Sequence, residues 1–193
     1  RRAYGMNGAN RDAVTASKLF ERVGSIVKRE EEVQDAQLGR NNVDVIVGKA
    51  SFSGPHELTI ASSAGQRTAT AENIMIAVGT TPATPAETKL DGKQILTSDE
   101  IFALEEMPHS MVVIGCGVVG IEYASMFALM GVQVTVVDGR ERPLEFLDRE
   151  IMDELVHQMR DSKVVFRLGE KVEGVEVREN ARGRVVVSLK SGK

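Results

Sequence analysis

The residues best placed to do chemistry are a glycine run, Gly115-Cys116-Gly117-Val118-Val119-Gly120, and an aspartate that follows it, Asp138. A short apolar run precedes the glycines and a helical pattern follows them. In that setting, three glycines at this spacing hold the pyrophosphate of a dinucleotide. Asp138 comes 18 residues after Gly120, close to the ~20 at which an acidic residue accepts hydrogen bonds from the adenosine ribose. The sequence therefore predicts a dinucleotide site.

Each glycine has its own physical role. Gly115 permits a tight turn from strand to helix, Gly117 leaves room for a phosphate beside the backbone, and Gly120 lets the helix pack closely on the strand. The first turn of the helix offers N–H groups and a partial positive charge to phosphates. The alternative is a glycine-rich turn that binds nothing, and the strand–turn–helix–strand setting disfavours it.

Two arginines near Asp138 leave the choice of nucleotide open. A carboxylate at this position favours NAD because it binds the ribose 2′-hydroxyl, whereas a nearby arginine accommodates the 2′-phosphate of NADP. Arg140 and Arg142 flank Glu141. They can equally be interpreted as loop arginines whose charge that glutamate balances.

The elements expected around this site are strands that alternate with helices. The expected strands cover 111–114, 132–137, 164–166, 172–177 and 185–189, and the expected helices cover 117–130 and 148–161. Gly131 is placed to end the first of these helices. This alternation predicts an α/β fold with a Rossmann-like nucleotide-binding unit.

The first half of the chain has another pattern. A helix is expected where apolar residues recur at helical spacing, and strands are expected where short apolar runs lie between turn residues. The helix covers 16–38, a small antiparallel meander has strands at 43–47, 57–62 and 66–71, and a buried return strand covers 73–78. A linker is expected over 80–93, with Pro82 and Pro85, and a short capped helix over 97–104. The pattern of residues 1–15 indicates neither a helix nor a strand.

The composition excludes several classes of protein. The 193 residues are 42% hydrophobic and 27% charged, with a net charge of −4 and scattered basic residues, which argues against a nucleic-acid partner. A single cysteine, Cys116, and three histidines far apart in sequence predict neither disulfides nor a metal site. No run approaches the ~20 apolar residues of a membrane helix. Without a signal peptide, the expected compartment is the cytoplasm.

The stretch Met111–Phe127, MVVIGCGVVGIEYASMF, resembles the nicotinamide-dinucleotide segment of the flavoprotein disulfide reductase family, whose members have two dinucleotide-binding domains. Upstream, NIMIAVGTTP (73–82) is similar to the second FAD-contacting motif of that family, and VGKASF (47–52) to its segment near the FAD adenine. The resemblance implies two parts. Residues 1–107 would be the C-terminal portion of a Rossmann-like FAD-binding domain, and residues 108–193 an NAD(P)-binding domain without its last strand.

The resemblance also implies roles for individual residues. All of these residues would bind a cofactor, and none would be a catalytic residue or a metal ligand. The nicotinamide dinucleotide would contact Gly115, Gly117, Val118, Val119 and Gly120, with Glu122 near the nicotinamide end. The adenosine end would lie at Asp138, Arg140 and Arg142, with Val172 beside the adenine. FAD would contact Lys49, Ala50 and Gly79.

The function implied is that of an FAD-dependent enzyme that uses NAD and NADP. The segment GRERPLEFLDRE (139–150) is similar to family members that transfer hydride between NADH and NADP through the flavin. Dihydrolipoamide dehydrogenase is the second hypothesis, and a nucleotide-sensing module without chemistry is the third.

Three features of the family are missing from this sequence. They are the N-terminal FAD glycine motif, the C-x-x-x-x-C redox pair and the C-terminal dimerisation domain. The chain is therefore expected to be an internal fragment that is inactive by itself. In the intact protein, a homodimer would form through the C-terminal domain.

Overall fold

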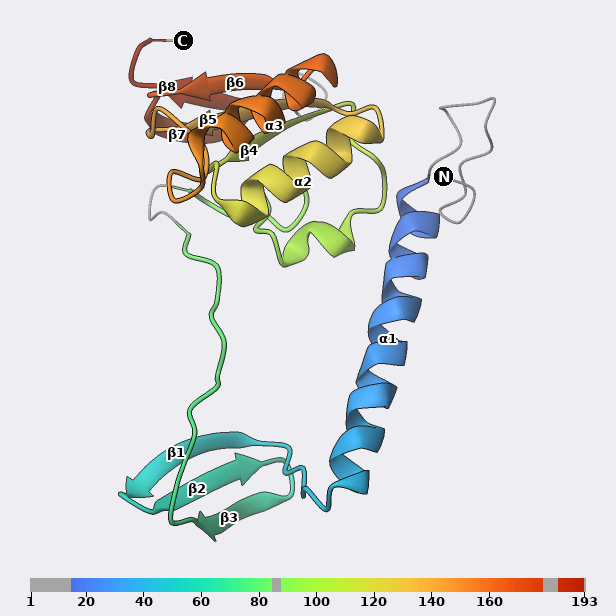
Figure 1. Ribbon diagram of the computed structural model, residues 1–193, viewed down its shortest axis with the longest axis vertical. Helices are drawn as coiled ribbons and strands as arrows, with labels where there is room; N and C mark the ends of the chain where they lie inside the picture. The colour runs from blue at the N-terminus through green and yellow to red at the C-terminus, as the bar shows by residue number, and fades with distance from the viewer. Residues whose placement is uncertain (1–14, 85–87, 179–183, 193) are drawn as a thin grey trace. The chain divides into compact units, whose positions relative to one another are not determined.

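The computed structural model describes residues 15–84, 88–178 and 184–192 (Figure 1). They form two compact units, one of residues 24–81 and one of residues 82–192 together with residues 15–23. Each unit is described by itself. Residues 1–14, over which no element is predicted, and part of the predicted linker, including Pro85, lie outside the described residues. The domain boundary between residues 107 and 108 stays a prediction.

The unit with the glycine motif contains a parallel sheet with two helices on one face (Figure 1). Its strands are β4 (Ser110–Ile114), β5 (Gln133–Asp138) and β6 (Val165–Leu168), hydrogen-bonded in that order. Helix α2 (Val118–Leu129) connects β4 to β5, and helix α3 (Arg149–Asp161) connects β5 to β6. This is the α/β Rossmann-like fold that the sequence predicts, with the expected elements present to within two residues.

Two smaller elements belong to the same unit. Strands β7 (Val172–Arg178) and β8 (Arg184–Leu189) pair antiparallel. The short helix η3 (Glu100–Ala103) comes before β4. The sequence predicts a capped helix here, but the N-cap residue Asp99 makes no side-chain cap hydrogen bond; instead, the Thr97 N–H donates to Oε2 of Glu100 at 2.8 Å.

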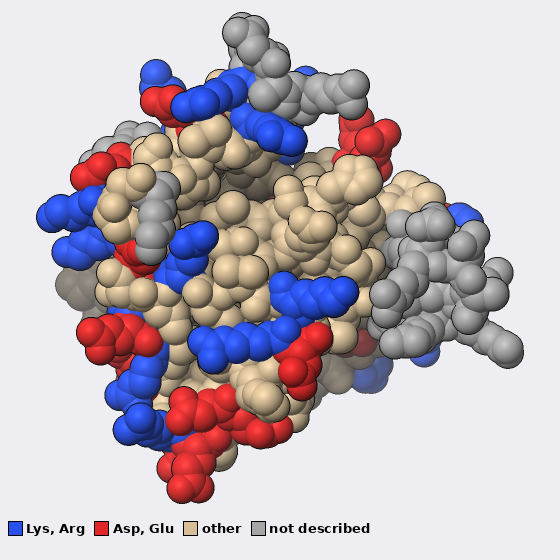
Figure 2. Space-filling model, turned by 90° about the horizontal axis from the view of Figure 1, so that it is seen from above, with Lys and Arg blue, Asp and Glu red and all other residues tan. Residues whose placement is uncertain are grey.

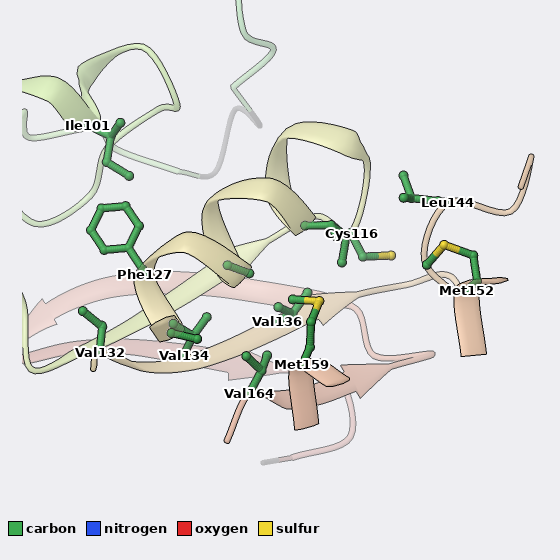
Figure 3. Packing of buried hydrophobic residues seen from close by; sticks show 13 residues of the cluster. Ile101, Cys116, Phe127, Val132, Val134, Val136, Leu144, Met152, Met159 and Val164 are labelled. Atoms are coloured by element: carbon green, nitrogen blue, oxygen red, sulfur yellow. The ribbon is translucent and has the colours of Figure 1, made fainter. Parts of the chain in front are cut away.

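The hydrophobic core of this unit lies between the sheet and the two helices (Figure 3). Val134 and Val136 point from β5 into it, and Phe127 comes from α2. Val137, the next residue of β5, is also buried, at 2% exposure. Burial of both Val136 and Val137 means that this end of β5 is covered on both faces, whereas Gln133 at its start is exposed.

The 24–81 unit contains the small meander. Strands β1 (Lys49–Gly54), β2 (Glu57–Ser62) and β3 (Gly65–Thr70) pair antiparallel in that order. The predicted helix is also present, as α1 (Ala16–Arg40), and most of its residues belong to this unit. Antiparallel neighbours in chain order need only short turns, which the sequence supplies at Gly54-Pro55 and Ala64-Gly65.

Two predicted strands, 43–47 and the return strand 73–78, are wrong. Neither segment is a strand, and the first strand of the meander is instead β1. Their apolar side chains are largely exposed, at 84% for Val47, 90% for Met75 and 87% for Val78. Such a run favours extended backbone, but a strand also needs a neighbour to exchange hydrogen bonds with. No described residue pairs with either segment.

The glycine positions give a matched pair of predictions about stability. A Cβ on Gly120 would overlap the carbonyl oxygen of Gly115 and lie 3.4 Å from Cγ1 of Val113, whereas a Cβ on Gly117 would meet nothing within 4 Å. We expect Gly120→Ala to destabilise the protein by about 2–3 kcal/mol because α2 must move off β4. Gly117→Ala should cost less than ~1 kcal/mol. Urea unfolding of the two variants measures this, and equal losses would contradict it.

Candidate dinucleotide-binding site

The glycine motif forms the turn between β4 and the N-terminus of α2. Gly115 has φ +111°, which residues with a side chain rarely adopt, and its N–H donates to the carbonyl oxygen of Val137 at 2.9 Å. Gly117 is the N-cap of α2. Because space is open where its side chain would be, a ligand can approach the backbone there. The N–H groups of the first helical turn, which lack partners within the helix, begin at the same point.

The other predicted contacts on α2 are accessible. Val118 and Val119 are about half exposed, at 48% and 50%, and Glu122 is exposed one turn further along. The first turn of α2 contains no acidic residue, so no side chain of that turn offsets the partial positive charge of the helix end. This end of α2 therefore suits an anionic group.

Asp138, the last residue of β5, hydrogen bonds back to the glycine loop. Its Oδ2 accepts from the backbone N–H of Cys116 at 2.7 Å. This contact joins the carboxyl end of one strand to the turn that follows the neighbouring strand. The side chain of Asp138 is only 10% exposed.

Arg140 closes over the same carboxylate. Its Nε donates to Oδ1 at 3.0 Å and its Nη2 to Oδ2 at 2.7 Å, while its backbone N–H also donates to Oδ1, at 2.7 Å. A carboxylate offers about four acceptor positions. With the bond from Cys116, all four are used by donors of the protein itself.

These hydrogen bonds shift both partners toward their charged forms. The side chain of Arg140 holds the pKa of Asp138 well below its usual range, although burial acts to raise it. The backbone N–H groups of Arg140 and Cys116 also lower this pKa. The hydrogen bond to Asp138 likewise raises the pKa of Arg140. The pair is therefore fully ionised at neutral pH.

Cys116 is buried inside the loop and points toward Leu144 and Met152 (Figure 3). Burial, followed by the nearby Asp138 carboxylate, raises the pKa of its thiol to about 11. A thiol with this pKa is protonated at neutral pH and is a poor nucleophile. Its role is packing, which agrees with the absence of a second cysteine from the chain.

Of the remaining predicted residues, Arg142 borders this loop, and the others lie elsewhere in the chain. Arg142 is exposed, and its carbonyl oxygen lies 3.7 Å from the Cys116 sulfur. Val172 begins β7 and is half-buried. The three residues predicted to contact FAD all belong to the 24–81 unit: Lys49 and Ala50 begin β1, and Gly79 has φ +66°.

A backbone contact between the loop and Leu144 is not predicted from the sequence. The N–H of Leu144 donates to the carbonyl oxygen of Cys116 at 3.4 Å, and Leu144 is buried although its φ is +45°. Leucine rarely adopts positive φ, so its residue type gives no signal of this turn. Two strand-end loops, 115–117 and 138–144, are thus joined by both backbone and side-chain hydrogen bonds.

In residues 15–84, 88–178 and 184–192, no group of three or more His, Cys, Asp or Glu side chains could hold a metal ion. No helix in that part of the chain is long and apolar enough to cross a membrane. On the face shown in Figure 2, Lys and Arg are interspersed with Asp and Glu, with no extended basic surface.

The fold and this loop define a Rossmann-type dinucleotide-binding unit, and comparison with known proteins identifies its family. The chain matches the pyridine nucleotide-disulphide oxidoreductase family over residues 3–193. It therefore belongs to that family, as the resemblance in the sequence predicted.

Curated relatives narrow the comparison. The chain is 42% identical over 195 residues to a protein of Mycobacterium tuberculosis (strain H37Ra) named soluble pyridine nucleotide transhydrogenase. This match covers all of the chain and 41% of the relative. It is 36% identical to the protein of the same name from Colwellia psychrerythraea, over 93% of this chain and 38% of the relative. The chain thus spans about two fifths of the length of these relatives.

Solved structures support the fold. The HOCl-induced flavoprotein disulfide reductase RclA from Escherichia coli superimposes with a TM-score of 0.77 at 28% identity, over 90% of this chain and 39% of RclA. LpdA from Mycobacterium tuberculosis superimposes with a TM-score of 0.84 at 24% identity, over 93% of this chain and 40% of LpdA. The latter likeness concerns the fold alone.

The pairing of Asp138 predicts a pH-dependent contribution to stability. Its pKa is lower in the folded protein than in the unfolded chain, where it is ~3.9. The contribution is therefore complete above the unfolded pKa and is lost as the pH falls through the folded pKa. Asp138→Asn keeps an acceptor for the Cys116 N–H but loses the charge. It should destabilise the protein by about 1–2 kcal/mol at pH 7, a value reduced by the exposure of Arg140.

Urea unfolding of the wild type and Asp138→Asn between pH 8 and pH 3 measures this contribution. We expect a constant difference in unfolding free energy from pH 8 to pH 5 and a shrinking difference below about pH 4. A difference that grows on acidification would show that the carboxylate is not held ionised in the folded protein.

Proposed function

We propose that the intact protein containing this chain is an FAD-dependent oxidoreductase that transfers hydride equivalents between NAD(H) and NADP(H). The observation that carries this proposal is the 42% identity along the whole chain to relatives named soluble pyridine nucleotide transhydrogenase. Family membership and the geometry of the glycine loop support it.

The residues of the loop fit a nicotinamide dinucleotide. Gly117 presents open backbone, and the N-terminus of α2 provides N–H groups for a pyrophosphate. Asp138, Arg140 and Arg142 would hold the adenosine end, with Val172 beside the adenine. Glu122 would lie toward the nicotinamide end. In this proposal the chain binds and orients the dinucleotide and contributes no catalytic residue.

The proposal assigns the FAD side to Lys49, Ala50 and Gly79. Lys49 and Ala50 are exposed at the start of β1, and Gly79, with φ +66°, is also exposed, so all three are accessible to a ligand. When bound, FAD accepts a hydride equivalent from one nicotinamide and passes it to another. Such a carrier is needed if one nicotinamide site serves both nucleotides in turn.

Disulfide reduction is the second candidate, as in dihydrolipoamide dehydrogenase. The likeness to RclA, which is described as a flavoprotein disulfide reductase, is the observation that favours it. This chemistry requires a cysteine pair, and the single cysteine of this chain, Cys116, does not separate the two candidates. The relatives at higher identity favour transhydrogenation. A homodimer located in the cytoplasm stays part of the proposal.

Gly117→Val in the intact protein tests the dinucleotide site. The side chain would occupy the space where a phosphate must approach, so we expect kcat/KM for both nicotinamide nucleotides to fall by at least ~10-fold, the equivalent of one charge-assisted hydrogen bond. Hydride exchange from NADPH to thio-NAD measures this, and the flavin absorbance should be unchanged. Unaltered KM values for both nucleotides would reject the site, and an intact protein without flavin would favour a nucleotide sensor.

A further inference from the structure

The carboxylate expected to bind the adenosine ribose is already saturated. Asp138 accepts one hydrogen bond from Cys116 and three from Arg140, all between 2.7 and 3.0 Å. A ribose hydroxyl can therefore donate to Asp138 only if one of these donors leaves. The N–H of Cys116 belongs to the backbone of the glycine loop, whereas the guanidinium of Arg140 ends a flexible side chain. Arg140 is the donor that can be exchanged.

The more exposed side chain of the pair is that of Arg140. The side chain of Arg140 is 46% exposed and that of Asp138 only 10%. A guanidinium has five N–H donors, and Nε and Nη2 each direct one to Asp138. The other N–H groups remain for an incoming anion. An arginine fixed by a carboxylate on one edge is oriented in advance to bind a phosphate on the other.

We propose that nucleotide choice at this site is an exchange at the Asp138 carboxylate, controlled by Arg140. This inference rests on the proposed function. A nucleotide with a 2′-phosphate binds while the Asp138–Arg140 pair stays closed and contacts the outer edge of the guanidinium. A nucleotide with a 2′-hydroxyl binds when the guanidinium of Arg140 moves away from Asp138. The ribose hydroxyl then donates to Asp138 in place of the guanidinium.

The closed pair has an electrostatic consequence. While Arg140 covers Asp138, its positive charge cancels that of the carboxylate, so a 2′-phosphate meets no uncompensated negative charge. Without Arg140, the carboxylate is uncovered, repels the phosphate and is available to a ribose hydroxyl. Arg140 is therefore a specificity-determining residue whose loss shifts the two affinities in opposite directions. An arginine that only bound phosphate would change one affinity.

Two matched probes test the exchange without redox chemistry: ADP-ribose and 2′-phospho-ADP-ribose, titrated calorimetrically into the intact, flavin-saturated protein. In Arg140→Ala, ADP-ribose should bind about 3–5-fold more tightly, because the half-exposed ion pair no longer competes. The 2′-phosphorylated probe should bind at least ~10-fold more weakly. Arg140→Met keeps the alkyl stem and should give changes of the same sign, which separates loss of the guanidinium from loss of packing.

Arg142→Ala is the charge-matched control. It removes one positive charge from the same loop but leaves the pair closed, so ADP-ribose should not bind more tightly. Unchanged or weaker ADP-ribose binding in both Arg140 variants would overturn the exchange, as would an equal gain in Arg142→Ala. If the wild type binds neither probe, the proposed function itself is wrong. If the wild type binds both probes but the Arg140 variants show no opposite shifts, only the exchange is wrong.

Discussion

The site depends on one link between two strand ends, the hydrogen bond from the Cys116 N–H to the Asp138 carboxylate. Parallel strands place their carboxyl ends side by side, and in this fold ligands bind at that edge. The link holds the turn after β4 against the end of β5, so the open backbone of Gly117 and the start of α2 keep a defined position. The backbone bonds from Gly115 to Val137 and from Leu144 to Cys116 act in the same direction.

The same carboxylate creates a conflict between holding the loop and binding a ligand. A carboxylate that is mostly buried is stable in charged form only with hydrogen-bond partners, and Arg140 supplies most of them. A partner that stabilises the empty site must then be displaced or reused when a nucleotide arrives. A protein proposed to use both NAD(H) and NADP(H) would benefit from a pair whose closed and open states suit different ligands.

The likeness to transhydrogenases and the geometry of the glycine loop support two different parts of the proposed function. The relatives indicate a class of reaction, whereas the loop indicates how one nucleotide is bound. The chain covers about two fifths of each relative named here, so the part assigned to FAD is represented by Lys49, Ala50 and Gly79 in the 24–81 unit. The described residues thus account in most detail for the nicotinamide-nucleotide side of the proposed function.

The sequence alone determined the Rossmann-like unit and the glycine loop, because both depend on local patterns: apolar periodicity, a glycine where φ is positive and another where the helix approaches Gly115. Segments 43–47 and 73–78 show the limit of that method, since the strand state of an apolar run depends on a partner elsewhere in space. Three of the four donors to Asp138 come from Arg140, two residues along the chain, and only the tertiary structure decided that the fourth is the Cys116 N–H. Hydrogen bonding between residues 22 positions apart follows from how β4 and β5 pair, and no local pattern encodes it.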